Sequence, residues 1–249
     1  MDMQYHIGLD DSHGAKIAIL PGDPARVPMI AEALDEAEPL AVRREYTSYV
    51  GKVGEHKVLV MSTGMGGPST AIGVEELVKT GVEVFIRLGT CGGMAMQVEP
   101  GDLVIAQAAI RSEGTGNQYT PVEYPAVADH GLVEALRHQA ERLNYPHHVG
   151  VVHCKDSFYA QHSPETMPIA TKLELDWQAW IASGALASEM ESATLYVVSS
   201  IRRVRAVCIL NVIWNQERAK AGIEEQDHKS MDHAIKTVVE MIREQGHML

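Results

Sequence analysis

The chain has 249 residues and a formal net charge of −12 at pH 7. This length allows one large domain with an ample core, and the hydrophobic content of 45% is ordinary for a globular protein. The acidic balance argues against nucleic acids and anionic membranes as partners, since both require a basic surface.

Hydropathy and cysteine usage bear on the cellular compartment. The sequence shows neither a run of 18 apolar residues nor a signal-peptide pattern, so we expect a cytoplasmic protein. Three cysteines, Cys91, Cys154 and Cys208, lie in apolar surroundings without the spacing of a metal site or a disulfide framework. We expect them to be buried free thiols, as in a reducing compartment.

A strand is predicted at residues 16–20, and a Pro-Gly turn and a helix follow it. Gly22 and Arg26 therefore lie at a strand-to-helix junction, where the N-terminus of a helix favours anions. An ordinary turn with an exposed Arg26 explains the same pattern. This motif alone leaves both interpretations open.

The next unit is predicted as a hairpin, with residues 43–46 in its first arm and residues 56–61 as the returning strand. Adjacent side chains on a strand point to opposite faces, so at most one of Arg43 and Arg44 can serve a given site. A solvated sheet edge is the alternative explanation for the arginine pair.

A glycine-rich loop at residues 62–69 precedes a predicted helix. The helix has an apolar stripe from Ala71 to Val78, and Gly81 is its expected stop. The loop lacks the Gly-x-x-x-x-Gly-Lys pattern of nucleotide P-loops, which argues against ATP or GTP chemistry.

The stretch at residues 84–93, VFIRLGTCGG, is the most informative of the chain. It predicts a short buried strand at 84–88 that is broken by glycines at its carboxyl end, where ligands bind in open α/β sheets. Arg87 lies where a core residue is expected, and a buried guanidinium needs an anionic partner. The glycines allow close approach of a ligand to the backbone, and Thr90 offers a hydroxyl. We predict an oxyanion site here, for phosphate.

Regular elements continue along the middle of the chain. Strands are predicted at 101–106 and 149–153, with a helix at 129–143 between them that Asp129 can cap. Lys155 follows the end of the second strand. These elements continue the α/β pattern.

No period persists from residue 156 to about residue 180, which predicts an irregular binding loop or lid. Four of its side chains are able to stack on a heterocycle or to form hydrogen bonds with it: Phe158, Tyr159, Gln161 and His162.

A helix is predicted from residue 188 to residue 198. Glu189 and Glu191 would then face different sides, so they cannot both be solubilising residues on one stripe. Acids that interact favourably with the helix dipole are the alternative. An apolar strand at 206–214, covered on both faces, and a helix at about 229–245 complete the prediction.

Five motifs, taken together and in this order, are similar to those of the hexameric nucleoside phosphorylase family. They are PGDPARV at 21–27, REY at 44–46, STGMGGPS at 62–69, RLGT at 87–90 and EME at 189–191. The resemblance covers essentially the whole chain and is strongest to the members that act on uridine. It implies one domain over residues 1–249, with a mixed, partly barrel-like central sheet flanked by helices.

The resemblance also implies an activity, which is the reversible phosphorolysis of uridine, and of deoxyuridine, to uracil and a pentose 1-phosphate. The phosphate site would contain Gly22, Arg26, Arg87 and Thr90, with Arg44 from a neighbouring subunit. The ribose site would contain Thr90, Met190 and Glu191, with Glu189 in support and His6 from the neighbouring subunit.

The base site separates purine from pyrimidine members. Purine members carry an aspartate near the end of the strand that corresponds to 206–214, whereas this chain has Val-Ile-Trp at 212–214. An apolar wall cannot protonate a purine, but it can pack against a small pyrimidine. The expected base contacts are Cys91, Gly92, Lys155, Phe158, Gln161, His162, Ile213 and Trp214.

The uridine enzymes of the family read uracil with a glutamine and, two residues later, an arginine. Here Gln161 matches the glutamine if one gap is allowed, but the arginine is missing. Our hypothesis is that Lys155 and His162 replace it and act in catalysis with Arg87 and Glu191, because uracil leaves as an anion. A surface role for Lys155 and a loop position without a role for His162 are the alternatives.

The resemblance requires no cofactor beyond phosphate as co-substrate. It allows a monovalent cation, K⁺, at a dimer interface, held by Glu45, Met65 and Ser69. Since His6 and Arg44 would be borrowed, a dimer is the smallest competent unit, and a hexamer of three dimers is expected.

Three other functions compete with this interpretation. The missing acid at 212–214 argues against a purine nucleoside phosphorylase, and the three arginines argue against a nucleosidase that uses water. A nucleoside-binding protein without catalysis is disfavoured because the residues matched to catalysis are intact.

Overall fold

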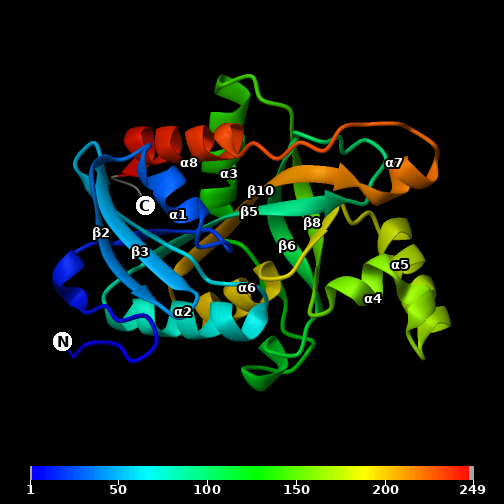
Figure 1. Ribbon diagram of the computed structural model, residues 1–249, viewed down its shortest axis with the longest axis horizontal. Helices are drawn as coiled ribbons and strands as arrows, with labels where there is room; N and C mark the ends of the chain where they lie inside the picture. Colours follow the sequence, from blue (N-terminus) through cyan, green and yellow to red (C-terminus); the bar gives the residue numbers. More distant parts are fainter. Residues whose placement is uncertain (1, 247–249) are drawn as a thin grey trace.

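The computed structural model describes residues 2–246 and shows an α/β fold built around one ten-stranded mixed sheet (Figure 1). The main strand order is β10-β6-β8-β9-β5-β1-β4-β3-β2, and β7 pairs with β6. The strands are β1 (Ile17–Leu20), β2 (Asp35–Arg43), β3 (Tyr46–Val53), β4 (His56–Met61), β5 (Val84–Gly93), β6 (Leu103–Ser112), β7 (Ala126–Val127), β8 (His147–Lys155), β9 (Ala187–Glu189) and β10 (Arg205–Asn215).

Helices cover both faces of the sheet, with α1, α3 and α8 on one side, α2 and α6 on the other, and α4, α5 and α7 at one end (Figure 1). The helices are α1 (Arg26–Ala31), α2 (Gly67–Lys79), α3 (His130–Arg142), α4 (Phe158–His162), α5 (Ala170–Ala182), α6 (Ser192–Arg202), α7 (Gln216–Lys220) and α8 (Asp232–Gln245). Three short 3₁₀ turns lie at Asp11–His13, Gly116–Gln118 and Pro164–Thr166.

Part of the sheet closes on itself. β10 pairs in parallel with β5 and antiparallel with β6, while β8 and β9 connect β6 back to β5. Strands β5, β10, β6, β8 and β9 therefore form a closed ring, and the remaining strands continue from β5 as an open sheet. This confirms the expected mixed, partly barrel-like sheet with flanking helices.

Several predicted elements are confirmed, namely the strand at 16–20, the helices at 71–78 and 129–143 and the strand at 206–214. Asp129 caps α3 by accepting a hydrogen bond from Leu132 N at 3.0 Å. The three cysteines are free and buried, as predicted. Each of these elements has either a clear apolar period or a continuous apolar run, because its apolar side chains are buried in the core.

The prediction that the glycines end the strand after Leu88 is wrong. β5 continues to Gly93, because Thr90 to Gly93 pair with β10, and Gly92 and Gly93 also pair with β9. The glycines provide space instead: a Cβ on Gly89 would lie 2.8 Å from Arg87 Nη2, and one on Gly93 would lie 2.6 Å from Asn215 Nδ2.

The predicted hairpin at 43–46 is also wrong in its details. β2 ends at Arg43, and Arg44 lies in the turn before β3 with a φ of +55°. The hairpin partner of β4 is β3, which begins only at Tyr46. β2 was missed because its residues are almost all exposed, so they show no alternation of apolar and polar side chains.

Residues 156–180 are not an irregular loop, since they contain α4, a 3₁₀ turn and most of α5. Trp177 is the one buried residue within Ala170–Ala182, so this helix shows no apolar stripe in the sequence. The predicted helix at 188–198 begins later, at Ser192, and Ser188 and Glu189 belong to the strand β9. Lys155 is the last residue of β8 rather than a residue beyond it.

Tyr196 joins α6 to two strands of the ring. Its hydroxyl donates to Ala106 O at 2.5 Å and accepts from Cys208 N at 3.0 Å, and the side chain is buried. This hydroxyl therefore satisfies groups on both β6 and β10 where the ring closes.

We expect Tyr196→Phe to lower the free energy of unfolding by about 1–3 kcal/mol, because it leaves a buried carbonyl and a buried N–H without this partner. Urea denaturation followed by circular dichroism measures the change. Tyr159→Phe, at an exposed tyrosine, is the matched control. Equal losses in the two variants would show that the Tyr196 hydroxyl does not support the closure.

Candidate active site

A cavity of about 770 Å³ lies where β1, β5, β8, β9 and β10 end. It gathers most of the residues that the sequence analysis selected, although they come from distant parts of the chain. Those residues are Gly22, Arg26, Arg87, Thr90, Cys91, Gly92, Lys155, Phe158, Gln161, His162, Glu189, Met190, Glu191, Ile213 and Trp214, together with Glu45 and Met65.

Arg87 forms the buried centre of one end of this cavity, with only 5% of its surface exposed. Its Nε donates to Glu189 Oε2 at 3.2 Å, and its Nη2 pairs with Glu191 Oε2. Nη1 is buried and has no hydrogen-bond partner within residues 2–246. Burial opposes the charge, but Glu191 and Glu189 raise the pKa of Arg87, so the guanidinium stays charged.

The unpartnered Nη1 faces the turn that follows β1. A Cβ on Gly22 would lie 3.9 Å from it, so the absence of a side chain there leaves room beside the donor. Arg26, at the start of α1, is half-buried nearby. Burial lowers the pKa of Arg26, Asp23 opposes this shift, and the positive charge of Arg87 adds to it. Two cations that repel each other beside one free donor make a site suited to an anion.

Glu189 holds Arg87 and the start of α6 together. Its Oε2 accepts from Glu191 N at 2.9 Å and from Ser192 N at 3.0 Å, and its Oε1 accepts from the Ser192 hydroxyl. Burial alone would raise the pKa of Glu189, but Arg87 and these hydrogen bonds lower it. This carboxylate is therefore occupied by the protein itself and positions the two residues beside it.

Glu191 is as buried as Glu189 but has fewer partners in the protein. Its Oε1 accepts from Gly66 N at 2.6 Å, in the glycine-rich loop, and its Oε2 pairs with Arg87. Burial raises the pKa of Glu191, and the nearby charge of Glu189 adds to this shift against the opposing charge of Arg87. Glu191 thus presents a carboxylate to the cavity at the N-terminal end of α6.

Aromatic and imidazole side chains line the opposite end of the cavity. His162 lies between Phe158 and Trp214, with ring centroids 4.1 Å and 5.7 Å away. Burial, followed by the charge of Lys155, lowers the pKa of His162, so the imidazole is neutral at pH 7. β10 has a bulge between Val212 and Trp214, and Ile213 and Trp214 line this end of the cavity.

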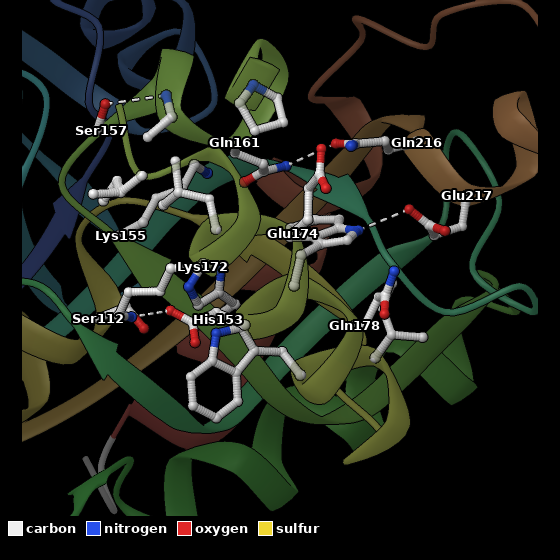
Figure 2. A pocket seen from close by; sticks show the side chains of 18 of the residues that line it. Ser112, His153, Lys155, Ser157, Gln161, Lys172, Glu174, Gln178, Gln216 and Glu217 are labelled. Carbon is white, nitrogen blue, oxygen red and sulfur yellow. Dashed lines mark hydrogen bonds and ion pairs between the residues drawn. The ribbon is translucent and has the colours of Figure 1, made fainter. Parts of the chain in front are cut away.

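A chain of hydrogen bonds runs along the same end. Lys155, only 7% exposed, donates from Nζ to Ser188 Oγ at 2.7 Å, and Ser188 Oγ donates to Gln161 Oε1 at 2.7 Å. Gln161 Nε2 then donates to Gln216 Oε1 at 3.1 Å (Figure 2). Burial lowers the pKa of Lys155. Ser188 and Gln216 were missed in the sequence, because only their pairing with distant residues distinguishes them.

A second cavity, of about 920 Å³, adjoins the first and shares Lys155 and Gln161 with it (Figure 2). Side chains of α5, including Trp177 and Trp180, form much of its wall. Trp177 Nε1 donates to Glu217 Oε1 at 2.8 Å, which ties α5 to α7. The hydrogen-bond chain therefore lies in the partition between the two cavities.

Three predicted site residues do not line the first cavity. His6 Nδ1 lies 2.6 Å from Glu76 Oε1, and the exposed ring of Tyr5 contacts both the His6 ring, at 4.8 Å, and the Arg44 guanidinium, at 5.9 Å. Ser69 Oγ donates to Glu45 Oε1 at 2.6 Å. His6 and Arg44 thus both contact Tyr5 and are not among the residues that line this cavity.

Neither a metal centre nor a membrane-spanning helix is found within residues 2–246. In this range no three His, Cys, Asp or Glu side chains gather in a way that could hold a metal ion. The helices of the same range are too short or too polar to cross a bilayer.

Comparisons with known proteins identify sequence relatives of the chain. A sequence model described as the Phosphorylase superfamily matches residues 16–244. A uridine phosphorylase of Treponema pallidum (strain Nichols) is 50% identical over 97% of this chain and 94% of its own length. A uridine phosphorylase of Escherichia coli (strain K12) is 37% identical over 96% of each chain. A guanosine phosphorylase of Halorubrum lacusprofundi is 35% identical, again over 96% of each.

We expect Glu189→Gln to lower the free energy of unfolding by about 3–5 kcal/mol, because it leaves the buried Arg87 with one carboxylate fewer. The replacement nearly keeps the shape, so the lost charge and acceptor account for the effect. Urea denaturation measures it, with the exposed Glu224→Gln as control. A variant as stable as the control would mean that Glu191 alone compensates the guanidinium.

Proposed function

We propose that this chain, which belongs to the phosphorylase superfamily, catalyses the reversible phosphorolysis of uridine and of deoxyuridine. The products are uracil and ribose or deoxyribose 1-phosphate, as in pyrimidine salvage. The observation that carries the proposal is one cavity with two different ends. One end holds a buried arginine donor without a hydrogen-bond partner among residues 2–246, and the other is lined by aromatic side chains, a histidine and a glutamine amide. The identity of 50% to a uridine phosphorylase supports the choice of base.

Phosphate would bind between Arg26 and Arg87, with Gly22 and Thr90 beside it. The free Nη1 of Arg87 and the proximity of the two cations support this assignment. Each charge-assisted hydrogen bond to phosphate is worth about 1.5–3 kcal/mol. Such contacts also offset the repulsion that an acidic protein exerts on an anion.

Ribose would lie between the phosphate and the rings, in contact with Thr90, Met190 and Glu191. Glu191 is suited to accept hydrogen bonds from the sugar hydroxyls, since it faces the cavity and is held by Gly66 N. Glu189 supports this arrangement from behind, because its oxygens are taken by Arg87 and the start of α6.

In the reaction, a phosphate oxygen forms a bond to C1′ while the bond from C1′ to the base nitrogen breaks with its electron pair. Positive charge grows on the sugar near the phosphate and Glu191, and negative charge grows on uracil near Lys155. The uracil anion takes a proton from water after release. No covalent bond to the protein is needed, since positioning of the two reactants supplies much of the rate.

Lys155 rather than His162 would stabilise the departing base. The pKa of His162 is lowered, which supports a neutral ring that stacks on the base with Phe158 and Trp214. The hypothesis from the sequence gave both residues a cationic role. The structure instead supports charge stabilisation by Lys155 and stacking by His162. Cys91, Gly92, Gln161 and Ile213 would complete the base site.

A second copy of the chain would complete the site with His6 and Arg44. Their position around the exposed Tyr5, outside the lining of their own cavity, supports this exchange. We therefore propose a dimer as the smallest active unit and a hexamer of three dimers as the assembly. Glu45, Ser69 and the Met65 carbonyl would hold K⁺ at the dimer interface, and the contact between Glu45 and Ser69 supports this site.

Two further proposals concern the whole chain. Residues 1–249 would form a single nucleoside phosphorylase domain, which the family match over 16–244 supports. A cytoplasmic location is supported by the three free, buried thiols. Phosphate would be the only co-substrate.

Guanosine phosphorolysis is the second candidate, because a guanosine phosphorylase is 35% identical to this chain. Guanine, like uracil, has a ring N–H beside a carbonyl, so the Gln161 amide suits both. The apolar segment at 212–214 offers no acid to protonate a purine, which favours uridine.

Incubation with uridine, deoxyuridine, guanosine or inosine, each with and without phosphate, tests the proposal. We expect uracil to be released from the first two nucleosides only when phosphate is present, as measured by chromatography of the free bases. Faster release from guanosine would favour the purine activity, release without phosphate would indicate hydrolysis, and no release would indicate binding alone.

Arg26→Met should raise the KM for phosphate about 10- to 100-fold, since it removes a charge-assisted contact that phosphate makes in the ground state as well as in the transition state. The KM for uridine should change far less. Steady-state kinetics at varied phosphate measure both constants. Arg243→Met, on the surface of α8, is the control, and a similar phosphate KM in both variants would remove Arg26 from the phosphate site.

A further inference from the structure

We propose that Ser188 fixes the orientation of the Gln161 amide and thereby makes the base end of the cavity select a ring N–H beside a carbonyl over the reverse pattern. Ser188 would be a positioning residue that acts through Gln161. The inference rests on the proposed function and deepens it, since it names what separates uridine from cytidine at this site.

The direction of the hydrogen-bond chain follows from the chemistry of its first member. A lysine ammonium has three donors and no acceptor, so Lys155 Nζ can only donate across the 2.7 Å to Ser188 Oγ. The single hydroxyl hydrogen of Ser188 is then available for another acceptor. Gln161 Oε1 lies 2.7 Å away and receives it.

His153 is the competing acceptor for this hydrogen. Its Nδ1 lies 3.4 Å from Ser188 Oγ, at the outer limit of a hydrogen bond, whereas Gln161 Oε1 is at an optimal distance. His153 is buried beside Trp177 and Trp180, which holds its ring in place. The shorter contact therefore takes the hydrogen, and the amide oxygen of Gln161 faces Ser188.

The other end of the amide also has a hydrogen-bond partner. Gln161 Nε2 donates to Gln216 Oε1 at 3.1 Å, on the side away from Lys155 (Figure 2). A flipped Gln161 would place an N–H donor against a serine that already accepts from lysine. Lys155 and Ser188 thus favour one of the two amide orientations, and Gln216 is matched to it.

A fixed amide has one lone pair on Oε1 and one hydrogen on Nε2 left for a ligand. Gln161 lines the nucleoside cavity, so these atoms are available to the base. Uracil fits them, since its N3–H donates to the oxygen and its adjacent carbonyl accepts from the nitrogen. Cytosine presents an acceptor and a donor in the opposite places, and it fits only if the amide flips.

The test uses two measurements. The first is the ratio of kcat/KM for uridine to kcat/KM for cytidine. The second is the ratio of the affinities for uracil and cytosine, measured by calorimetry in the presence of phosphate. We expect Ser188→Ala to lower the preference for uridine and for uracil about tenfold, the equivalent of one hydrogen bond. The KM for phosphate should not change, because the Ser188 hydroxyl forms its short hydrogen bonds with Lys155 and Gln161, at the base end of the cavity.

Ser199→Ala is the matched control, since it removes another buried serine hydroxyl, which has no hydrogen-bond partner within residues 2–246. It should keep the preference of the unmodified protein. A second pair of variants tests the hydrogen-bond chain from its other end, at Gln216. Gln216→Glu, which can only accept, should keep the preference, and Gln216→Lys, which can only donate, should lower it as Ser188→Ala does.

The outcomes separate this inference from the proposed function. An unchanged preference in Ser188→Ala, or equal effects of Gln216→Glu and Gln216→Lys, would overturn the inference, and so would an unmodified protein that binds uracil and cytosine equally. If the protein binds uracil in preference but releases no base from uridine, the proposed function fails. The inference then stands if Ser188→Ala removes that binding preference.

Discussion

The buried guanidinium of Arg87, held between Glu189 and Glu191, is the interaction on which the rest of the site depends. Removing such a charge from water is costly unless it is paired, and the two carboxylates supply the pairing. The two carboxylates do not occupy every donor of the guanidinium, because Nη1 has no partner in the part of the chain that the structure describes. The same contacts that stabilise the fold therefore leave one strong donor unused beside Gly22, which also lines the cavity.

Closure of the sheet makes this arrangement possible. β10 pairs with both β5 and β6, and the short strand β9 connects β8 back to β5. In an open sheet, Glu189 and Arg87 would lie on strands that need not meet. In the ring they become neighbours although 102 positions separate them in the sequence. The closed ring of strands also carries residues of both ends of the cavity, with Arg87 at the anion end and Lys155 and Trp214 at the other. This suits a reaction that depends on placing two substrates.

The sequence allowed prediction of the parts whose chemistry is local. Arg87 in an apolar strand beside glycines indicated a buried anion site, and the motifs around it indicated the fold. The missed features depend on distant partners. β9 is short and was assigned to a helix because the acids near Glu189 resemble a first helical turn. α5 has one buried residue, Trp177, and therefore no apolar stripe. Ser188 carries no local signal, because its role comes from Lys155 and Gln161, which β8 and α4 bring to it.

In the proposed function, Lys155 would link the chemistry of the base to its recognition. Burial lowers its pKa, so a negative charge that develops on the base beside it is well placed to favour the charged ammonium. That same ammonium cannot accept a hydrogen bond, and this gives the chain through Ser188 to Gln161 its direction. A neutral hydroxyl in place of Lys155 could donate or accept, and the amide would then lose its preferred orientation. Stabilisation of the leaving group and discrimination of its edge would thus both follow from one buried cation.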